Sequence, residues 1–185
     1  IAKQNVRIGE GSIVEPNVTI HEHCIIGKDT VIRAGSVIGG EGFEPKWVAG
    51  KHIIVQHAGG VHIGDGVEIQ SNCHVARSVF GGFTEIGDET KVDSLVNISH
   101  NVVIGSGCEI AAGSSIAGST SIGNNVWIGP GSTISSGIKI GDDASITLGS
   151  VVVSDVSKGQ RVTGNFAVEH TKFLSFFLRL RKGWG

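Results

Sequence analysis

Isoleucine or valine recurs at every sixth position along most of this chain. The repeat runs from Ile8 to Ile38, continues in a phase of its own from Ile63 to Val75, and resumes from Ile86 to Val152, with 21 hexads in all. An α-helix repeats every 3.6 residues and a strand every two, so neither explains a period of six. The pattern predicts an all-β parallel β-helix over residues 1–160, with three hexads per coil and about seven coils.

Each hexad follows one rule around its core position. The residue after the isoleucine or valine is often glycine, as at Gly87 and Gly105, and the residue two before it is small or β-branched, as at Thr90 and Ser114. We expect the glycine to tolerate the positive φ or the crowding of a tight corner. The isoleucine and valine side chains then stack inside a narrow prism.

Two interruptions break the period. Ile63 follows Ile38 after 25 residues instead of six, which predicts an inserted loop at about residues 40–61, and about five further residues interrupt the repeat near 77–83. Loops that leave a rigid scaffold often carry specificity. Phe43 and Trp47 are costly to expose, so we expect them near a bound sugar or nucleotide base. The alternative is a passive surface loop.

The repeat ends after Val153, and residues 161–185 predict a turn and a short C-terminal helix. Phe173, Phe177 and Leu180 follow helical spacing. A solenoid needs its open end covered, so we interpret this segment as a capping helix. Its many basic residues favour a second interpretation, an amphipathic helix that meets an acidic carrier protein or a membrane surface.

Composition narrows the class of protein further. The formal net charge is −2, so the chain as a whole lacks the basic footprint of a nucleic-acid-binding protein, and no apolar run is long enough for an integral membrane segment. Three widely spaced cysteines form no disulfide framework and indicate a reducing cytoplasm. They occupy small-residue positions of the repeat, which disfavours a cysteine nucleophile. The histidines show no metal-ligand spacing, so we expect no metal site.

His100 is the strongest candidate for chemistry. It lies two residues past the core position Ile98, at a corner, so its side chain should project from the prism. One coil further along the same edge is Gly118, and two coils further are Ser136 and Gly137. These small residues leave room for an extended thioester beside an imidazole, which can accept a proton near neutral pH.

The segment around His100 also carries a family resemblance. It reads Lys91-x-Asp93-x-Leu95-Val96-x-Ile98-x-His100-Asn101 and is followed by Ile116-Ala117-Gly118-Ser119-Thr120. Together with Gly42-Phe43 and Trp47, this is similar to the UDP-3-O-acylglucosamine N-acyltransferases of lipid A synthesis, which are hexapeptide-repeat enzymes. The resemblance implies a left-handed β-helix, a homotrimer and a cytoplasmic enzyme.

The resemblance also implies site residues. The matching histidine of that family is the general base and an amide one coil above it contacts the oxyanion, so these roles fall to His100 and Gly118. Asp93 is a weaker candidate for orienting the base or contacting substrate. The remaining candidates are two groups: Asn97, Asn101, Phe43 and Trp47 for the acceptor substrate, and Ser136, Gly137, Gly164 and Asn165 for the acyl donor.

The expected reaction is acyl transfer from acyl-CoA or acyl carrier protein, without a bound cofactor, to the amino group of a nucleotide-linked amino sugar. We expect this reaction to be a step in lipopolysaccharide or surface-polysaccharide synthesis. Gly137 stands where the lipid A enzymes have a second histidine that helps to bind a hydroxyacyl group, which favours a short donor or one not held through a 3-hydroxyl. Two alternatives stay open: a non-catalytic hexapeptide-repeat scaffold and a zinc enzyme similar to γ-carbonic anhydrases.

Overall fold

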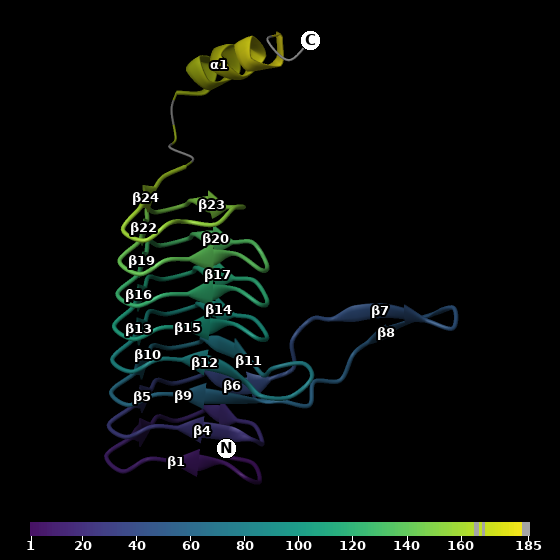
Figure 1. Cartoon of the computed structure of the whole chain (residues 1–185), viewed down its shortest axis with the longest axis vertical. Coiled ribbons are helices and arrows are strands. Elements are labelled where there is room, and N and C mark those ends of the chain that lie inside the picture. The colour runs from purple at the N-terminus through teal and green to yellow at the C-terminus, as the bar shows by residue number, and fades with distance from the viewer. Residues whose placement is uncertain (165–166, 168, 183–185) are drawn as a thin grey trace.

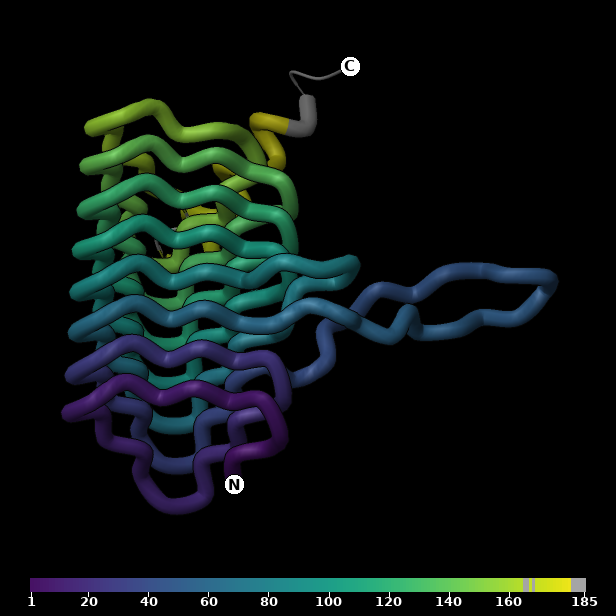
Figure 2. Tube along the Cα trace, turned by 60° about the horizontal axis from the view of Figure 1, so that its bottom comes forward, coloured from purple at the N-terminus to yellow at the C-terminus, as the bar shows by residue number. Residues whose placement is uncertain are grey.

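The computed structural model describes residues 1–164, 167 and 169–182. The chain winds into a three-sided rod of stacked coils, from which one long hairpin projects sideways (Figures 1 and 2). A single helix, α1 (His170–Lys182), lies beyond the last coil (Figure 1). The repeat has therefore produced the parallel β-helix that it predicts.

Each side of the rod is one parallel sheet of very short strands. Sheet A contains β3 (Thr19–Ile20), β6 (Val37–Gly40), β11 (His74–Ala76), β14 (Asn97–Ile98), β17 (Ser115–Ile116), β20 (Thr133–Ile134) and β23 (Val151–Val152). Sheet B contains β1 (Arg7–Ile8), β4 (Cys24–Ile26), β9 (Gly60–Ile63), β12 (Phe83–Ile86), β15 (Val103–Ile104), β18 (Ser121–Ile122) and β21 (Lys139–Ile140). Sheet C contains β2 (Ile13–Val14), β5 (Val31–Ile32), β10 (Glu68–Ile69), β13 (Lys91–Val92), β16 (Glu109–Ile110), β19 (Trp127–Ile128), β22 (Ser145–Ile146) and β24 (Arg161–Val162).

The core is a set of aliphatic ladders in strict register. Ile98 pairs with Val75 below it and with Ile116 above it, and all three side chains are buried. Partners from Ile86 to Val152 are eighteen residues apart, or three hexads. The two insertions leave the ladders in register because each bulges out as a whole. The inserted loop forms a separate antiparallel hairpin, β7 (Pro45–Val48) and β8 (Lys51–Ile54).

The glycine rule is half correct. Outside the two insertions, the positive φ angles of the described residues fall three residues after the core position, as at Asn101 with φ 59° and Asn125 with φ 55°, and Gly39, with φ 77°, is the one exception directly after a core position. The glycine after the core position is needed because neighbouring coils lie too close together for a side chain. A Cβ on Gly87 would lie 2.6 Å from the carbonyl carbon of Gly105 in the next coil. Backbone crowding between coils therefore selects glycine there.

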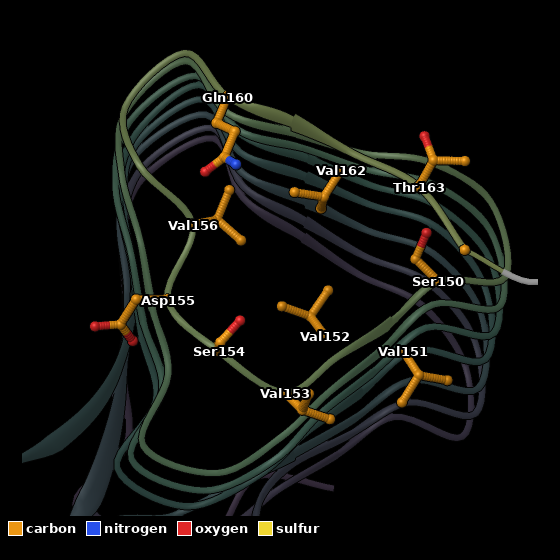
Figure 3. A pocket seen from close by; sticks show the side chains of 11 residues that line it. Ser150, Val151, Val152, Val153, Ser154, Asp155, Val156, Gln160, Val162 and Thr163 are labelled. Carbon is orange, nitrogen blue, oxygen red and sulfur yellow. The ribbon is translucent and has the colours of Figure 1, made fainter. Parts of the chain in front are cut away.

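The solenoid extends past the predicted end of the repeat. Val156 bridges to Ile140, and β24 pairs Val162 with Ile146, so both stack sixteen residues after their partners instead of eighteen. This coil is two residues shorter than the others, so its core positions no longer fall on the six-residue period and the sequence pattern does not reveal them. Val152, Val156 and Val162 point into its interior, where a hollow of about 180 Å³ remains (Figure 3).

The expected cap does not form within this chain. Every side chain of α1 from His170 to Leu180 is exposed, including Phe173 and Leu178. The helix lies beyond the last coil (Figure 1), and none of its apolar side chains among the described residues is buried against that coil. Among the described residues, no helix is both long and apolar enough to cross a membrane.

Candidate active site

One corner of the prism carries the central candidate residues. It is formed by the turns that lead from sheet A to sheet B, and we call it the AB corner. His100 lies there between β14 and β15, Gly118 lies one coil above, and Ser136 and Gly137 lie two coils above. Both insertions leave from the same corner in the coils below His100 (Figure 2). The chain therefore concentrates its non-repetitive residues around His100.

The turn that carries His100 is fixed by its backbone. Ser99 N–H donates to the carbonyl of Ile116, and the His100 carbonyl accepts from Ser119 N–H at 3.0 Å. Asn101 N–H donates to the hydroxyl of Thr84 at 2.9 Å, and Asn101 tolerates its left-handed backbone because asparagine adopts that region more readily than most residues. The imidazole therefore starts from a rigid backbone.

The side chain of Asn101 sets the tautomer of His100. Its Oδ1 accepts from Val79 N–H at 3.1 Å, and a backbone N–H only donates, so the orientation of the amide is settled. The same Oδ1 lies 3.1 Å from Nδ1 of His100, which must therefore carry the proton. Its Nδ2 donates to Ser78 Oγ at 2.6 Å. The neutral imidazole consequently keeps a lone pair on Nε2, as a general base requires.

Gly118 fits against the face of this ring. A Cβ at Gly118 would lie 2.5 Å from Cε1 and 2.7 Å from Nε2 of His100, so only glycine leaves the imidazole in place. Gly118 is buried, and its carbonyl accepts from Gly137 N–H. Its own N–H donates no hydrogen bond within the described part of the chain. An N–H without a protein partner, in a residue packed on the His100 ring, suits the stabilisation of an oxyanion.

A carboxylate from the base of the inserted loop reaches the imidazole. Oε2 of Glu44 lies 3.7 Å from Nε2 of His100. The Lys46 ammonium, 2.7 Å from Oε1, holds the pKa of the Glu44 carboxyl below its usual range. Glu44 is therefore ionised at neutral pH, where its negative charge attracts a cationic ligand.

Two predicted polar residues lie away from Nε2 of His100. Asp93 follows β13 at the preceding corner, between sheets C and A, where its carboxylate accepts from Ser94 N–H. Within one chain it does not orient His100, and Asn101 does so instead. Asn97 lies on the outer face of β14, where its Oδ1 is 3.2 Å from Nδ1 of His74.

The predicted aromatic residues project from the rod with the hairpin. Phe43 is 76% exposed and Trp47 is 74% exposed, and Trp47 stacks on His52 with ring centroids 4.9 Å apart. The hairpin tip points away from its own coils (Figure 2), so Trp47 does not approach its own His100. The base of the loop reaches the AB corner instead, at Gly42, Glu44 and His57.

The four residues predicted to contact the donor form no single cluster. Ser136 and Gly137 are exposed at the AB corner, and the space a Gly137 Cβ would occupy is open. Gly164 lies at the far end of the solenoid, beside the hollow in the last coil. Asn165 lies outside the described residues.

The cysteines do not supply a nucleophile. Cys24, Cys73 and Cys108 are all buried, which fits their predicted role as small corner residues. Burial raises the pKa of all three thiols, that of Cys24 to about 11, so each stays protonated at neutral pH. Across the residues that the structure describes, no three histidine, cysteine or acidic side chains converge as a metal site.

Sequence reasoning missed the residues that the two insertions bring to His100. These are Glu44, His57, Ser78 and Val79, which all lie where the period of six is interrupted. Their signal is positional: each insertion begins directly after a strand of sheet A, as the turn of His100 does. The register alone places both insertions at the AB corner.

The fold and this corner define a class of protein, the parallel β-helices with hexapeptide repeats. Residues 5–40, 83–118 and 119–154 match the family described as "Bacterial transferase hexapeptide (six repeats)". These segments make up more than half of the chain, which therefore belongs to this family of bacterial transferases. The β-helix is left-handed, as expected.

Curated relatives include two UDP-3-O-acylglucosamine N-acyltransferases. That of Anaeromyxobacter sp. (strain Fw109-5) is 37% identical over 123 residues, which cover 63% of this chain and 35% of the relative. That of Shewanella denitrificans is 44% identical over 95 residues, which cover 51% and 28%. The chain thus spans about a third of the length of these relatives.

Solved structures support the fold. The UDP-N-acetylglucosamine acyltransferase of Francisella novicida superposes with a TM-score of 0.80 at 23% identity, covering 95% of this chain and 64% of that one. The enzyme of the same name from Campylobacter jejuni gives a TM-score of 0.71 at 20% identity, covering 89% and 69%. At these identities the likeness concerns the fold alone.

Proposed function

We propose that this chain is an N-acyltransferase that moves an acyl group from a thioester, acyl-CoA or acyl carrier protein, to the amino group of a nucleotide-linked amino sugar. The observation that carries the proposal is the pairing of His100, whose Nε2 lone pair is left free by Asn101, with the free N–H of Gly118. The similarity of the chain to N-acyltransferases of amino sugars supports the choice of acceptor.

The chemistry follows from these groups. The amine nitrogen attacks the thioester carbonyl carbon, and the carbonyl π electrons move to oxygen, where Gly118 N–H stabilises the charge. Nε2 of His100 takes a proton from the attacking nitrogen. Collapse of the tetrahedral intermediate breaks the carbon–sulfur bond, and the thiolate leaves with the proton from the imidazolium. Glu44 stabilises that imidazolium in between.

We propose a homotrimer as the working form, located in the cytoplasm. One flat face of a prism cannot enclose a ligand, since binding clefts commonly cover most of a ligand's surface. The projecting hairpin supports a shared cleft, because it exposes Phe43, Trp47, Val48, Ile53 and Ile54 on one element. A threefold assembly gives three equivalent clefts, each with one His100 and one hairpin from a neighbour.

The donor is proposed to be short or to lack a contact through a 3-hydroxyl. Gly137 has open space around it, so no side chain at this position grips a hydroxyacyl group. Competition between acetyl-CoA and a 3-hydroxyacyl carrier protein tests this point. A strong preference for the hydroxyacyl donor would contradict it.

The central test is replacement of His100 by alanine. We expect His100→Ala to fold and assemble as wild type does, and to lose about 10² to 10⁴ in kcat with a nucleotide amino sugar and an acyl thioester. A matched control is His62→Ala, since His62 is exposed on β9 and lies outside the site. Retention of more than about a tenth of the wild-type kcat would refute the assignment of His100 as the general base. Absence of transfer by the wild type would favour a scaffold.

A further inference from the structure

His57 is a second imidazole in the same corner, and nothing in the reaction as described uses it. It lies in the segment that returns from the hairpin to β9, and it is 3% exposed. Its ring centroid is 5.5 Å from that of His100, with the two rings inclined at 68°. The inserted loop therefore places a buried histidine directly beside the base.

The hydrogen bonds of His57 define its tautomer. Nδ1 lies 2.9 Å from the carbonyl oxygen of Val55 and 3.1 Å from Oε2 of Glu41. The carbonyl only accepts, so Nδ1 carries a proton. Glu41 also accepts from the His57 backbone N–H at 3.0 Å, which fixes the carboxylate beside the ring. In the neutral ring Nε2 then holds a lone pair.

That lone pair has no partner. Among the described residues, Nε2 of His57 is the one buried side-chain nitrogen or oxygen without a hydrogen bond. Buried polar atoms are nearly always paired, so an orphan beside a reactive group points to a ligand. Gly42 separates it from the base: a Cβ there would lie 2.7 Å from Nε2 of His57 and 3.2 Å from Cδ2 of His100.

The two rings match the hydrogens of an amine. A neutral primary amine has two N–H groups and a lone pair, whereas a hydroxyl has only one hydrogen to donate. His100 removes one N–H proton during the attack, and a second acceptor is needed for the other. Glu41 and Glu44 add negative charge at both rings, which attracts the cationic ammonium form of the acceptor; the ammonium gives one proton to solvent before the neutral amine attacks.

We propose that Nε2 of His57 accepts the second N–H of the attacking amine, and thereby makes the site selective for an amine over a hydroxyl acceptor. This inference rests on the proposed N-acyltransferase function. In the free chain Gly42 covers the atom, so the acceptor reaches it by displacing the short backbone segment 41–43. The absence of a side chain at Gly42 keeps that displacement small.

The test compares two replacements of His57 in the full-length protein. His57→Asn can place its amide NH₂ where Nδ1 donates to Val55 and Glu41, but it has no atom at the Nε2 position. His57→Gln can bring its amide oxygen to the Nε2 position. His62→Asn is the matched control, because His62 is exposed on β9. Each variant is assayed with one acyl thioester against a nucleotide amino sugar and its hydroxyl counterpart.

We expect His57→Asn to raise KM for the amino sugar about tenfold and to lower the preference for amine over hydroxyl by a similar factor. The donor KM should not change, and His57→Gln should restore part of the preference. If His57→Asn does not fold, Gly42→Ala replaces it, since its methyl group fills the space at Nε2 of His57; an unchanged kcat shows that the methyl group has not displaced His100 as well. An acceptor KM within twofold of wild type in the folded variant overturns the inference. Wild type that acylates no amino sugar refutes both proposals.

Discussion

Oδ1 of Asn101 lies 3.1 Å from Nδ1 of His100 and 3.1 Å from the backbone nitrogen of Val79. The second bond comes from the short insertion and settles which way the amide points. In the first contact Oδ1 can then only accept, so Nδ1 of His100 carries the proton and the lone pair is left on Nε2. A loop that never touches the ring thus decides its tautomer, and Asn101 acts as a positioning residue.

Replacement of Asn101 should separate this role from folding. Asn101→Gly keeps the left-handed backbone but removes the acceptor, so we expect kcat to fall by up to about 100-fold with KM little changed. Asn101→Asp keeps the acceptor and adds a negative charge, which should move the acid limb of the pH–rate profile to higher pH. Asn125→Gly, at an equivalent left-handed position of another corner, is the control. Identical pH profiles for Asn101→Asp and wild type would contradict the contact.

Gly118 should be intolerant of any side chain. The methyl group of Gly118→Ala would overlap Cε1 and Nε2 of His100, and the ring can swing aside without disturbing the coil. We expect a stable protein with kcat reduced by about 10² or more. Activity and thermal unfolding are measured together.

Gly123→Ala provides the contrast. Its Cβ would lie 2.5 Å from Oδ1 and 2.6 Å from the backbone nitrogen of Asp142, in a corner without His100. It should therefore lower Tm while the folded fraction keeps its kcat. If Gly118→Ala behaves in the same way, the clash with His100 is not the reason for glycine at 118.

The ion pair between Glu22 and Arg77 should make stability depend on pH. Arg77 is buried, its Nη1 lies 2.8 Å from Oε1 of Glu22, and its hydrogen bond lowers the pKa of Glu22 to about 2 from 4.5. Between about pH 2 and pH 4.5, the native state therefore keeps the Glu22 carboxylate ionised, whereas the unfolded chain protonates it. The stabilisation is present above pH 4.5 and disappears as the pH falls towards 2.

Glu22→Gln isolates this effect. We expect a lower Tm than wild type at pH 7, where about 1 kcal/mol corresponds to a shift of roughly 2–4 °C for a chain of this size. The difference should narrow below pH 4.5. Glu109→Gln, at an exposed position on β16, should show no such narrowing. An equal deficit at pH 7 and pH 3 would show that the ion pair does not titrate as described.

The shared cleft predicts complementation between inactive subunits. One variant carries His100→Ala, and the other has Trp47–His52 replaced by an Asn-Gly turn, which shortens the hairpin but keeps Glu44 and His57. Each alone should be inactive. Mixed trimers contain some clefts with an intact His100 and an intact neighbouring hairpin, so activity should return. If mixed trimers form and stay inactive, the hairpin does not complete the site of a neighbour.

The sequence predicted the parts of this molecule that repeat. Ile98, Val75 and Ile116 stack as the period requires, because one residue out of phase would turn a buried side chain towards solvent. The same reasoning placed His100 and Gly118 together, one coil apart on one corner. It missed the stacking of Val162, where a coil is two residues short, and it left open whether positive φ or crowding selects the glycine after the core position; crowding does so at Gly87.

The contacts that tune His100 could not be read from the period. Asn101 was expected to bind substrate, yet its amide is used by Val79, Ser78 and the imidazole. Those partners lie in segments whose backbone is set by their own hydrogen bonds and not by stacking. Asp93 was a weaker candidate, by resemblance, for orienting the base or contacting substrate, and within one chain it lies at another corner.

The constant coil of eighteen residues above His100 has an evolutionary consequence. A segment of eighteen residues can be duplicated or lost between Gly123 and Ile146 with every ladder rejoined in register, because Ile122 and Ile140, like Ile128 and Ile146, are equivalent positions. Each such event changes the rod by one strand spacing, about 4.8 Å, and leaves the His100 turn untouched. Descendants of this gene can therefore vary the length of the rod in whole steps while the reactive corner is inherited unchanged.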